Sequence, residues 1–379
     1  MFYLIYTEFL MTAAIFNSAK TIEEYKNTPI FMGPEPGFMD TIYKNHPKLW
    51  NLYKELKALD WSEDEFDFTR CLLDFKNCHQ DTSDMMIETI GWQWEADSVA
   101  GRSIVSILAP FVSSTEYWTT LVRIADNENI HGATYSEIVK LSFEDTDSVM
   151  QRILNFKNTQ ARMTILENTL SEALTLSRKY AAGEIEASDE LYRDVPIKTT
   201  ICLLFLERVQ FMASFAVTFS ICSTGLFQPI GKAVQKICQD ELEVHAEFDK
   251  EVIKYELKTE RGQWAMESLK PWMHQIADEF IQCEYSFIDS LFRDGRHLPG
   301  VTPDMLKQWV LYNAKDVVRF LGLDMADKYT FPKYDPMPLL ETWINMNKTQ
   351  AAPQEQDLAQ YKVGVVIDDA AETVFDLDF

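Results

Sequence analysis

One short stretch of the chain carries an acid, an imidazole and a phenol about one helical turn apart. In ADNENIHGATYSEIV, residues 125–139, these groups belong to Glu128, His131 and Tyr135. Residues three and four positions apart share one face of an α-helix, so the three side chains lie on the same side. Carboxylates and imidazoles are metal ligands. A helix on the protein surface would have no need to align these groups on one face. The spacing indicates a metal site and leaves the phenol to be explained.

Further acids stand in apolar surroundings on other expected helices. Burying four carboxylates without compensation would destabilise the fold strongly, because even one lone buried ion costs several kcal/mol. Two metal ions would supply the missing charge, as in helical bundles that build dimetal sites from acids and histidines on four helices. The expected ligands are Asp97 in EADSVAGRS, Glu128 and His131 in ENIH, Glu207 in LFLERVQF, and Glu241 and His245 in QDELEVH.

The second acid–imidazole pair has an unusual spacing. Glu241 and His245 are four residues apart, whereas Glu128 and His131 are three apart. Positions i and i+4 still share a helical face, and a π-bulge would absorb the extra residue. Glu243 is the competing ligand but would point to the other side, so Glu241 and His245 are preferred. The remaining histidines, at positions 46, 79, 274 and 297, stand in less promising contexts, and those at 46 and 79 in polar, exposed-looking ones.

The elements that must position these ligands are predicted to be long helices. Gly (13) and Pro (14) are sparse among 379 residues, of which 46% are hydrophobic, and this favours helices over a turn-rich β fold. Ser113 and Glu116 form a capping-box pattern at the start of one helix. Apolar periodicity and helix-breaking residues predict an all-α bundle with helices at about 40–60, 85–110, 114–141, 146–182 (a hairpin), 199–222, 230–256, 263–292 and 303–322.

Charge and hydrophobicity exclude several classes of function. The net charge of −24 argues against attraction to nucleic acid or to an anionic membrane. The apolar segment 199–222 contains Glu207, Arg208 and Gln210, which indicates a central bundle helix rather than a membrane span. Residues 1–28 are expected to form a loosely held arm. The six scattered cysteines form no C-x-x-C pair, which favours reduced core thiols in a cytoplasmic protein.

These motifs together resemble the small, radical-generating subunit of class I ribonucleotide reductase. The resemblance runs from about residue 30 to the C-terminus, and its motifs occur in the family's order. They are DSVAGRS around Asp97, ENIHGATY, LERVQFMASF, QDELEVH, LFRDG at 291–295, TQAAPQE at 349–355 and QYKVG at 360–364.

The resemblance implies a ferritin-like domain over residues 29–330, with extra helices around its bundle. A C-terminal segment, residues 331–379, would follow, with a disordered tail that binds the large subunit; a homodimer is expected from the family. One metal would be bound by Asp97, Glu128 and His131 and the other by Glu207, Glu241 and His245, with Glu128 and Glu241 bridging. Iron is the expected metal, and two manganese ions or one ion of each are the alternatives.

The resemblance also explains the phenol. Tyr135 would be oxidised to a stable radical when O2 reacts at the metals. Phe211, Phe215 and Ile237 would form the apolar pocket that shields this radical. The radical would then serve a large subunit that binds ribonucleotides and reduces them to deoxyribonucleotides.

Transfer of the oxidation would use further residues. Trp61, with Asp240 and His131, would carry electrons between the metal site and the surface. Tyr361 and Glu355 in the tail would relay the oxidation to the large subunit. The tail from Thr349 onward has seven acids against one lysine and ends in VFDLDF, a composition typical of a segment that orders on a partner.

Two other readings use the same residues. Another ferritin-like dimetal oxidase, such as a monooxygenase, a desaturase or an iron-storage oxidase, would need the metal ligands but not Tyr135, Trp61 or a tyrosine-bearing tail. A metal-free helical scaffold would bind a partner through VFDLDF and hold no metal.

Overall fold

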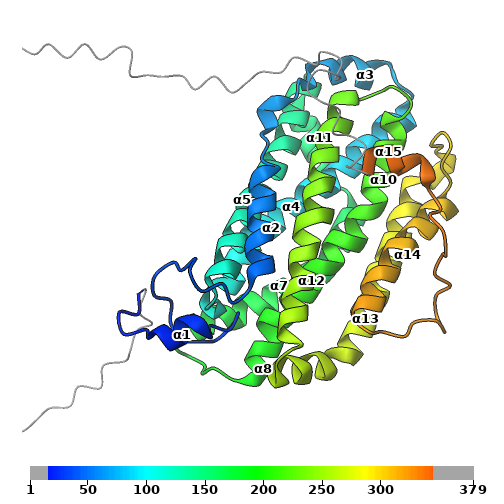
Figure 1. The fold of residues 1–379 in the computed structure, drawn as a ribbon. Coiled ribbons are helices and arrows are strands. Elements are labelled where there is room, and N and C mark those ends of the chain that lie inside the picture. The colour runs from blue at the N-terminus through cyan, green and yellow to red at the C-terminus, as the bar shows by residue number, and fades with distance from the viewer. Residues whose placement is uncertain (1–15, 345–379) are drawn as a thin grey trace, which may run out of the picture.

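The computed structural model describes residues 16–344, apart from the side chains of residues 157–161. Within this part the chain forms helices and two isolated β-bridges, and Figure 1 shows the long helices packed into one bundle. The predicted all-α architecture is confirmed. Its long helices are α4 (Gln80–Leu108), α5 (Thr115–Ser142), α7 (Lys157–Ala181), α10 (Phe211–Cys222), α11 (Gln228–Gln239), α12 (Ala246–Glu256), α13 (Glu260–Leu291) and α14 (Pro303–Phe320).

Shorter elements flank or extend these helices. Three of them are π-helical and continue a neighbouring α-helix: η4 (Arg193–Ile197), η5 (Leu206–Gln210) and η6 (Asp240–His245). The others are α1 (Ile22–Lys26), α2 (Pro47–Ala58), η1 (Glu63–Glu65), η2 (Phe68–Arg70), α3 (Cys71–Asn77), η3 (Ala109–Phe111), α6 (Thr146–Leu154), α8 (Asp189–Tyr192), α9 (Lys198–Phe205), η7 (Arg293–Gly295), η8 (Pro338–Leu340) and α15 (Glu341–Ile344).

One predicted helix start and one predicted helix cap were wrong. The helix expected from residue 40 begins at Pro47, because proline disfavours the helical conformation of the residue before it and suits the first helical position. The capping box predicted for Ser113 and Glu116 is absent. Ser114 caps α5 instead, with its Oγ accepting the N–H of Tyr117 at 3.2 Å.

Residues 199–222 form a buried central helix, as predicted. The continuous helical run Asp189–Cys222 is long and apolar enough to cross a membrane, but 94% of its most apolar window is buried inside the protein. It joins α8, η4, α9, η5 and α10 through the middle of the bundle. This helix and the run from α11 to α12 carry two π turns that bear predicted metal ligands.

A close approach between α4 and α5 brings two predicted ligands together. Gly101 of α4 lies against α5, where a Cβ at this position would be 3.1 Å from the Cβ of Glu128. With a Cβ at this position, Glu128 would have to shift by a few tenths of an ångström, so glycine permits the close approach of the two helices. Gly101 is one helical turn beyond Asp97, so the contact sets the separation of Asp97 and Glu128.

Candidate dimetal site

The structure brings the six predicted ligands together at the centre of the bundle. Each is at most 3% exposed. They form two overlapping groups, in each of which one ligand atom per residue lies within 4.8 Å of the others. The groups are Asp97, Glu128, His131 and Glu241, and Glu128, Glu207, Glu241 and His245. Glu128 and Glu241 belong to both, which is the arrangement that two bridging carboxylates require.

The π turn η6 accounts for the unusual spacing of Glu241 and His245. The wider turn places both side chains on one side of the helix, with His245 Nδ1 2.9 Å from Glu241 Oε2. The same nitrogen lies 3.4 Å from Glu128 Oε1 on α5. Glu243 is only half-buried and belongs to neither ligand group. The π-bulge predicted from the spacing is thus confirmed.

Several ligand atoms of the cluster have no hydrogen-bond partner within the described part of the chain. Buried polar atoms without partners are rare in proteins, so their concentration in one place calls for a charged group that satisfies them. The donor set of carboxylate oxygens and imidazole nitrogens fits iron or manganese. The atoms without a hydrogen bond are both carboxyl oxygens of Asp97, Oε2 of Glu128, Nδ1 of His131, Oε2 of Glu207 and Oε1 of Glu241. Of these, Nδ1 of His131 and Oε1 of Glu241 lie 3.0 Å apart as an ion pair that lacks hydrogen-bond geometry. The cluster could therefore hold two metal ions.

The electrostatics of the cluster also favour a cation. Burial, and then the neighbouring carboxylates, raise the pKa of Asp97 and Glu207 well above the usual value. Burial opposes the charged form of His245, but Glu241 and Glu128 outweigh it and raise its pKa to about 10. Burial also opposes the charged form of His131, but its interactions with Asp240, Glu128 and Glu241 together outweigh burial and raise its pKa well above the usual value. Protons balance the carboxylates in this state, and metal ions would displace them.

Tyr135 lies on α5 one turn beyond His131 and is fully buried. Its hydroxyl has no hydrogen-bond partner among the described residues. Burial, together with the charges of Asp97 and Glu241, raises its pKa well above the ordinary value. The three residues predicted to shield it are buried in the same hydrophobic core: Phe211, Phe215 and Ile237. The rings of the two phenylalanines are stacked with their centroids 5.4 Å apart.

The predicted transfer residues Trp61, Asp240 and His131 form a hydrogen-bonded chain. Trp61 is 5% exposed, and its Nε1 donates to Asp240 Oδ2 at 2.7 Å. The same oxygen lies 3.1 Å from His131 Nε2. The structure thus links Trp61 to a predicted metal ligand through a single carboxylate. Tyr361 and Glu355 lie outside the described residues.

Sequence reasoning missed two buried polar residues beside the site. Asn127 Nδ2 donates to Asp240 Oδ2 at 3.1 Å, and its Oδ1 lies 2.9 Å from His245 Nε2, so it ties the two π-turn residues to α5. Its position immediately before Glu128 was the available signal. Asp249, one turn beyond His245, lines a cavity of about 20 Å³ together with Glu128 and Glu207. Apolar side chains form most of the remaining wall.

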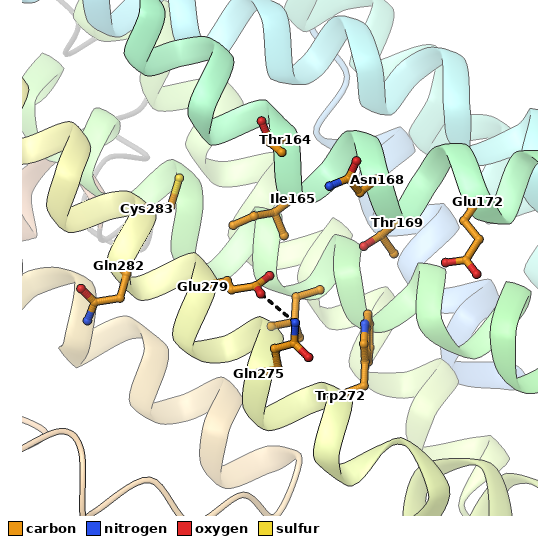
Figure 2. A pocket seen from close by; sticks show the side chains of 11 residues that line it. Thr164, Ile165, Asn168, Thr169, Glu172, Trp272, Gln275, Glu279, Gln282 and Cys283 are labelled. Atoms are coloured by element: carbon orange, nitrogen blue, oxygen red, sulfur yellow. Dashed lines mark hydrogen bonds between the residues drawn. The ribbon is translucent and has the colours of Figure 1, made fainter.

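A larger hollow lies away from the cluster, between α7 and α13. This groove has a volume of about 640 Å³ and contains none of the predicted site residues. Figure 2 shows side chains from both helices around it, including Trp272 and the pair Gln275 and Glu279, which are hydrogen-bonded at 2.8 Å. Its open, mixed lining points to no particular chemistry.

Comparisons with known proteins identify the family to which the chain is similar. The family model described as "Ribonucleotide reductase, small chain" matches residues 41–330. Ribonucleoside-diphosphate reductase 1 subunit beta of Escherichia coli O157:H7 is 24% identical over 361 residues, covering 92% of this chain and 95% of that protein. The beta subunit of Enterobacteria phage T4 is 20% identical over 371 residues, covering 92% and 95% of the two chains.

Solved structures show the same fold. The ribonucleotide reductase R2 subunit from Clostridium botulinum matches with a TM-score of 0.70 and 15% identity, over 88% of this chain and 98% of that one. The dimanganese(II)-NrdF of Streptococcus sanguinis matches with a TM-score of 0.62 and 17% identity, over 80% and 98%. The predicted ferritin-like bundle is confirmed.

Proposed function

The chain belongs to the family of ribonucleotide reductase small chains, and we propose that it generates a radical on Tyr135. This radical serves a large subunit in the reduction of ribonucleotides to deoxyribonucleotides. The observation that carries the proposal is the convergence of six buried ligands, five of which have an atom without a hydrogen-bond partner among the described residues. One of them, His131, lies one helical turn from the buried phenol of Tyr135. The ferritin-like domain spans residues 29–330 and contains all of these groups.

The proposed ligand assignment follows the two groups of the cluster. Asp97 and His131 hold one ion, Glu207 and His245 hold the other, and Glu128 and Glu241 bridge them. Iron is the proposed metal, with manganese or a mixed pair as the alternative, because the oxygen-rich donor set accepts both. The structural relative from Streptococcus sanguinis is a dimanganese(II) protein. When bound and reduced, the two metal ions would react with O2 and so supply the oxidising power that oxidation of Tyr135 requires.

The protein's own residues control where this oxidation goes. The Tyr135 hydroxyl keeps its proton at neutral pH, as an ordinary tyrosine does, and its raised pKa further disfavours loss of the proton alone, so its oxidation releases an electron and a proton together. The buried pocket of Phe211, Phe215 and Ile237 keeps water and reductants from the radical. The small cavity beside Glu128 and Glu207 has room for one molecule of the size of water or O2.

Transfer to the large subunit uses the chain of Trp61, Asp240 and His131, followed by Glu355 and Tyr361. The acidic tail with its closing aromatic residues orders on the large subunit, and the small subunit acts as a homodimer. The six cysteines form no disulfide among the described residues and most of them are buried, which supports a reducing compartment, the cytoplasm.

Aerobic reconstitution tests the proposal. The metal-free protein is loaded anaerobically with Fe²⁺ and exposed to O2, and the metal content and the electron paramagnetic resonance spectrum are measured. We expect two ions per chain and a tyrosyl-radical signal. Two ions without a radical would favour another dimetal oxidase or a monooxygenase. A protein that binds no transition metal would contradict the proposal.

A further inference from the structure

An arginine side chain lies buried where four elements of the bundle meet. Arg162 on α7 is 1% exposed, and its guanidinium lies between the rings of Trp92 and Phe287, 3.7 Å from each centroid. Its Nε donates to Glu284 Oε1 at 2.8 Å. Arg162 thus contacts α4 through Trp92 and α13 through Phe287 and Glu284. An isolated cation would be costly at this depth, so Glu284 compensates its charge.

The remaining contact of Arg162 is with the π turn that carries Glu207. Its Nη2 donates to the backbone carbonyl of Gln210 at 2.6 Å, and Gln210 Nε2 donates back to the carbonyl of Arg162 at 3.3 Å. Gln210 is the last residue of η5, in which the N–H of Phe211 bonds to the carbonyl of Leu206, five residues earlier. The guanidinium therefore holds the C-terminal end of this turn.

A π turn is rare and shifts the hydrogen bonds of a helix by one residue, so it needs support from its surroundings. If η5 relaxed to an α turn, the side chains on one side of it would rotate about the helix axis. Glu207 would then no longer point toward Glu128 and Glu241. The reciprocal hydrogen bonds between Arg162 and Gln210 oppose this relaxation.

We propose that Arg162 is a positioning residue of the dimetal site, which fixes the π turn Leu206–Gln210 so that Glu207 can bind metal. The inference rests on the proposed function, because it assigns Glu207 to one of two ions. Among the described residues, the polar contacts of Arg162 are with Glu284 and Gln210, so it does not touch a metal ligand itself. Through Trp92, five residues before Asp97 on α4, the same side chain also braces the helix of a ligand to the other ion.

The test uses a double variant and a matched control. Arg162→Met/Glu284→Met removes both charges together and leaves no unpaired buried ion. Arg162→Lys keeps the charge, but its ammonium group lacks the planar guanidinium geometry that donates to two partners at once. This variant replaces the double variant in the test if the double variant does not fold. The control is Arg296→Met, which loses ion pairs of 2.8 Å to Asp84 and 2.9 Å to Glu88 on α4 without touching a π turn.

Mn²⁺ alone is titrated anaerobically into each full-length protein, with calorimetry for the stoichiometry and electron paramagnetic resonance for coupling between the ions. Thermal unfolding compares their stabilities. In the double variant we expect one ion to bind at least tenfold more weakly and the spectrum to change from a coupled pair to an isolated ion. The Arg296→Met variant should bind two coupled Mn²⁺ ions even if it loses as much stability as the double variant.

The outcomes separate this inference from the proposed function. A folded variant at Arg162 that binds a coupled pair with wild-type affinity overturns the positioning role and leaves the proposed function intact. Equal weakening in Arg296→Met also overturns it, since general destabilisation would then suffice. A wild-type protein that binds no pair of ions overturns both.

Discussion

A single carboxylate oxygen organises the polar chemistry beside the metal ligands. Asp240 Oδ2 accepts from Trp61 and Asn127 and lies within hydrogen-bond distance of His131. The resemblance to the family predicted the set of Trp61, Asp240 and His131, which the residue types alone would not have singled out. Asn127 was missed because an amide beside a glutamate has no distinctive pattern in sequence. Only the fold shows that it also reaches His245.

At the residue scale, Tyr135→Phe should abolish the radical and leave the metal site intact. The Tyr135 hydroxyl has no hydrogen-bond partner among the described residues, so its removal breaks no contact. We expect two ions per chain, no tyrosyl signal after reaction with O2, and a free energy of unfolding within about 1 kcal/mol of the wild type. Metal analysis, electron paramagnetic resonance and thermal unfolding check this. A tyrosyl signal that persists in the variant would assign the radical to another residue.

At the scale of the elements, the helices could be predicted from sequence where the apolar periodicity is strong. A π turn could be predicted only where two metal ligands on the same helix have an unusual spacing. The spacing of Glu241 and His245 revealed the π turn η6. Glu207 has no second predicted ligand on its helix, so nothing in the sequence pointed to η5 or to the arginine that supports it. The cap of α5 was misassigned because Glu116 does not cap its own helix. It contacts His46, which is buried and not exposed as its context suggested.

Glu116 makes the start of α5 sensitive to pH. Burial by itself raises the pKa of Glu116, but hydrogen bonds from His46 and Ser114 outweigh it and lower the pKa to about 2. In the unfolded chain the pKa returns to about 4.5. The depressed pKa therefore contributes stability above pH 4.5, on the order of 3 kcal/mol, which is lost as the pH falls toward 2.

The Glu116→Gln variant should thus be less stable than the wild type at pH 7. At low pH the stabilities of the two proteins should become similar. Urea unfolding of both proteins between pH 7 and pH 3 measures the difference. Glu137→Gln, at a half-buried position on the same helix, is the control and should show little change. A difference between Glu116→Gln and wild type that stays constant over this range would contradict the assignment.

At the scale of the whole molecule, the bundle and the tail have separate tasks. The composition predicted the bundle, since sparse Gly and Pro and one almost wholly apolar helix leave few other folds. The mutual distances of the ligands could not be read from sequence, because they depend on contacts such as that of Gly101 with Glu128. The tail's composition separated it from the core, and its partner was inferred from the family.

Deleting residues 349–379 should separate radical formation from its use. The truncated protein keeps all six ligands and Tyr135, so we expect unchanged metal content and radical yield. Turnover with the large subunit should fall to background, because Glu355, Tyr361 and the terminal apolar residues are removed. Full-length protein with the tail replaced by a Gly/Ser sequence of equal length is the control for chain length. Normal turnover by either altered protein would show that the tail is dispensable.

The central claim is that two metal ions lie among Asp97, Glu128, His131, Glu207, Glu241 and His245. Anomalous X-ray diffraction from crystals of the iron- or manganese-loaded protein, recorded on both sides of the metal's absorption edge, locates such ions directly. The account predicts two peaks inside the bundle, with Glu128 and Glu241 next to both. A single peak, or peaks only at the surface, would contradict it.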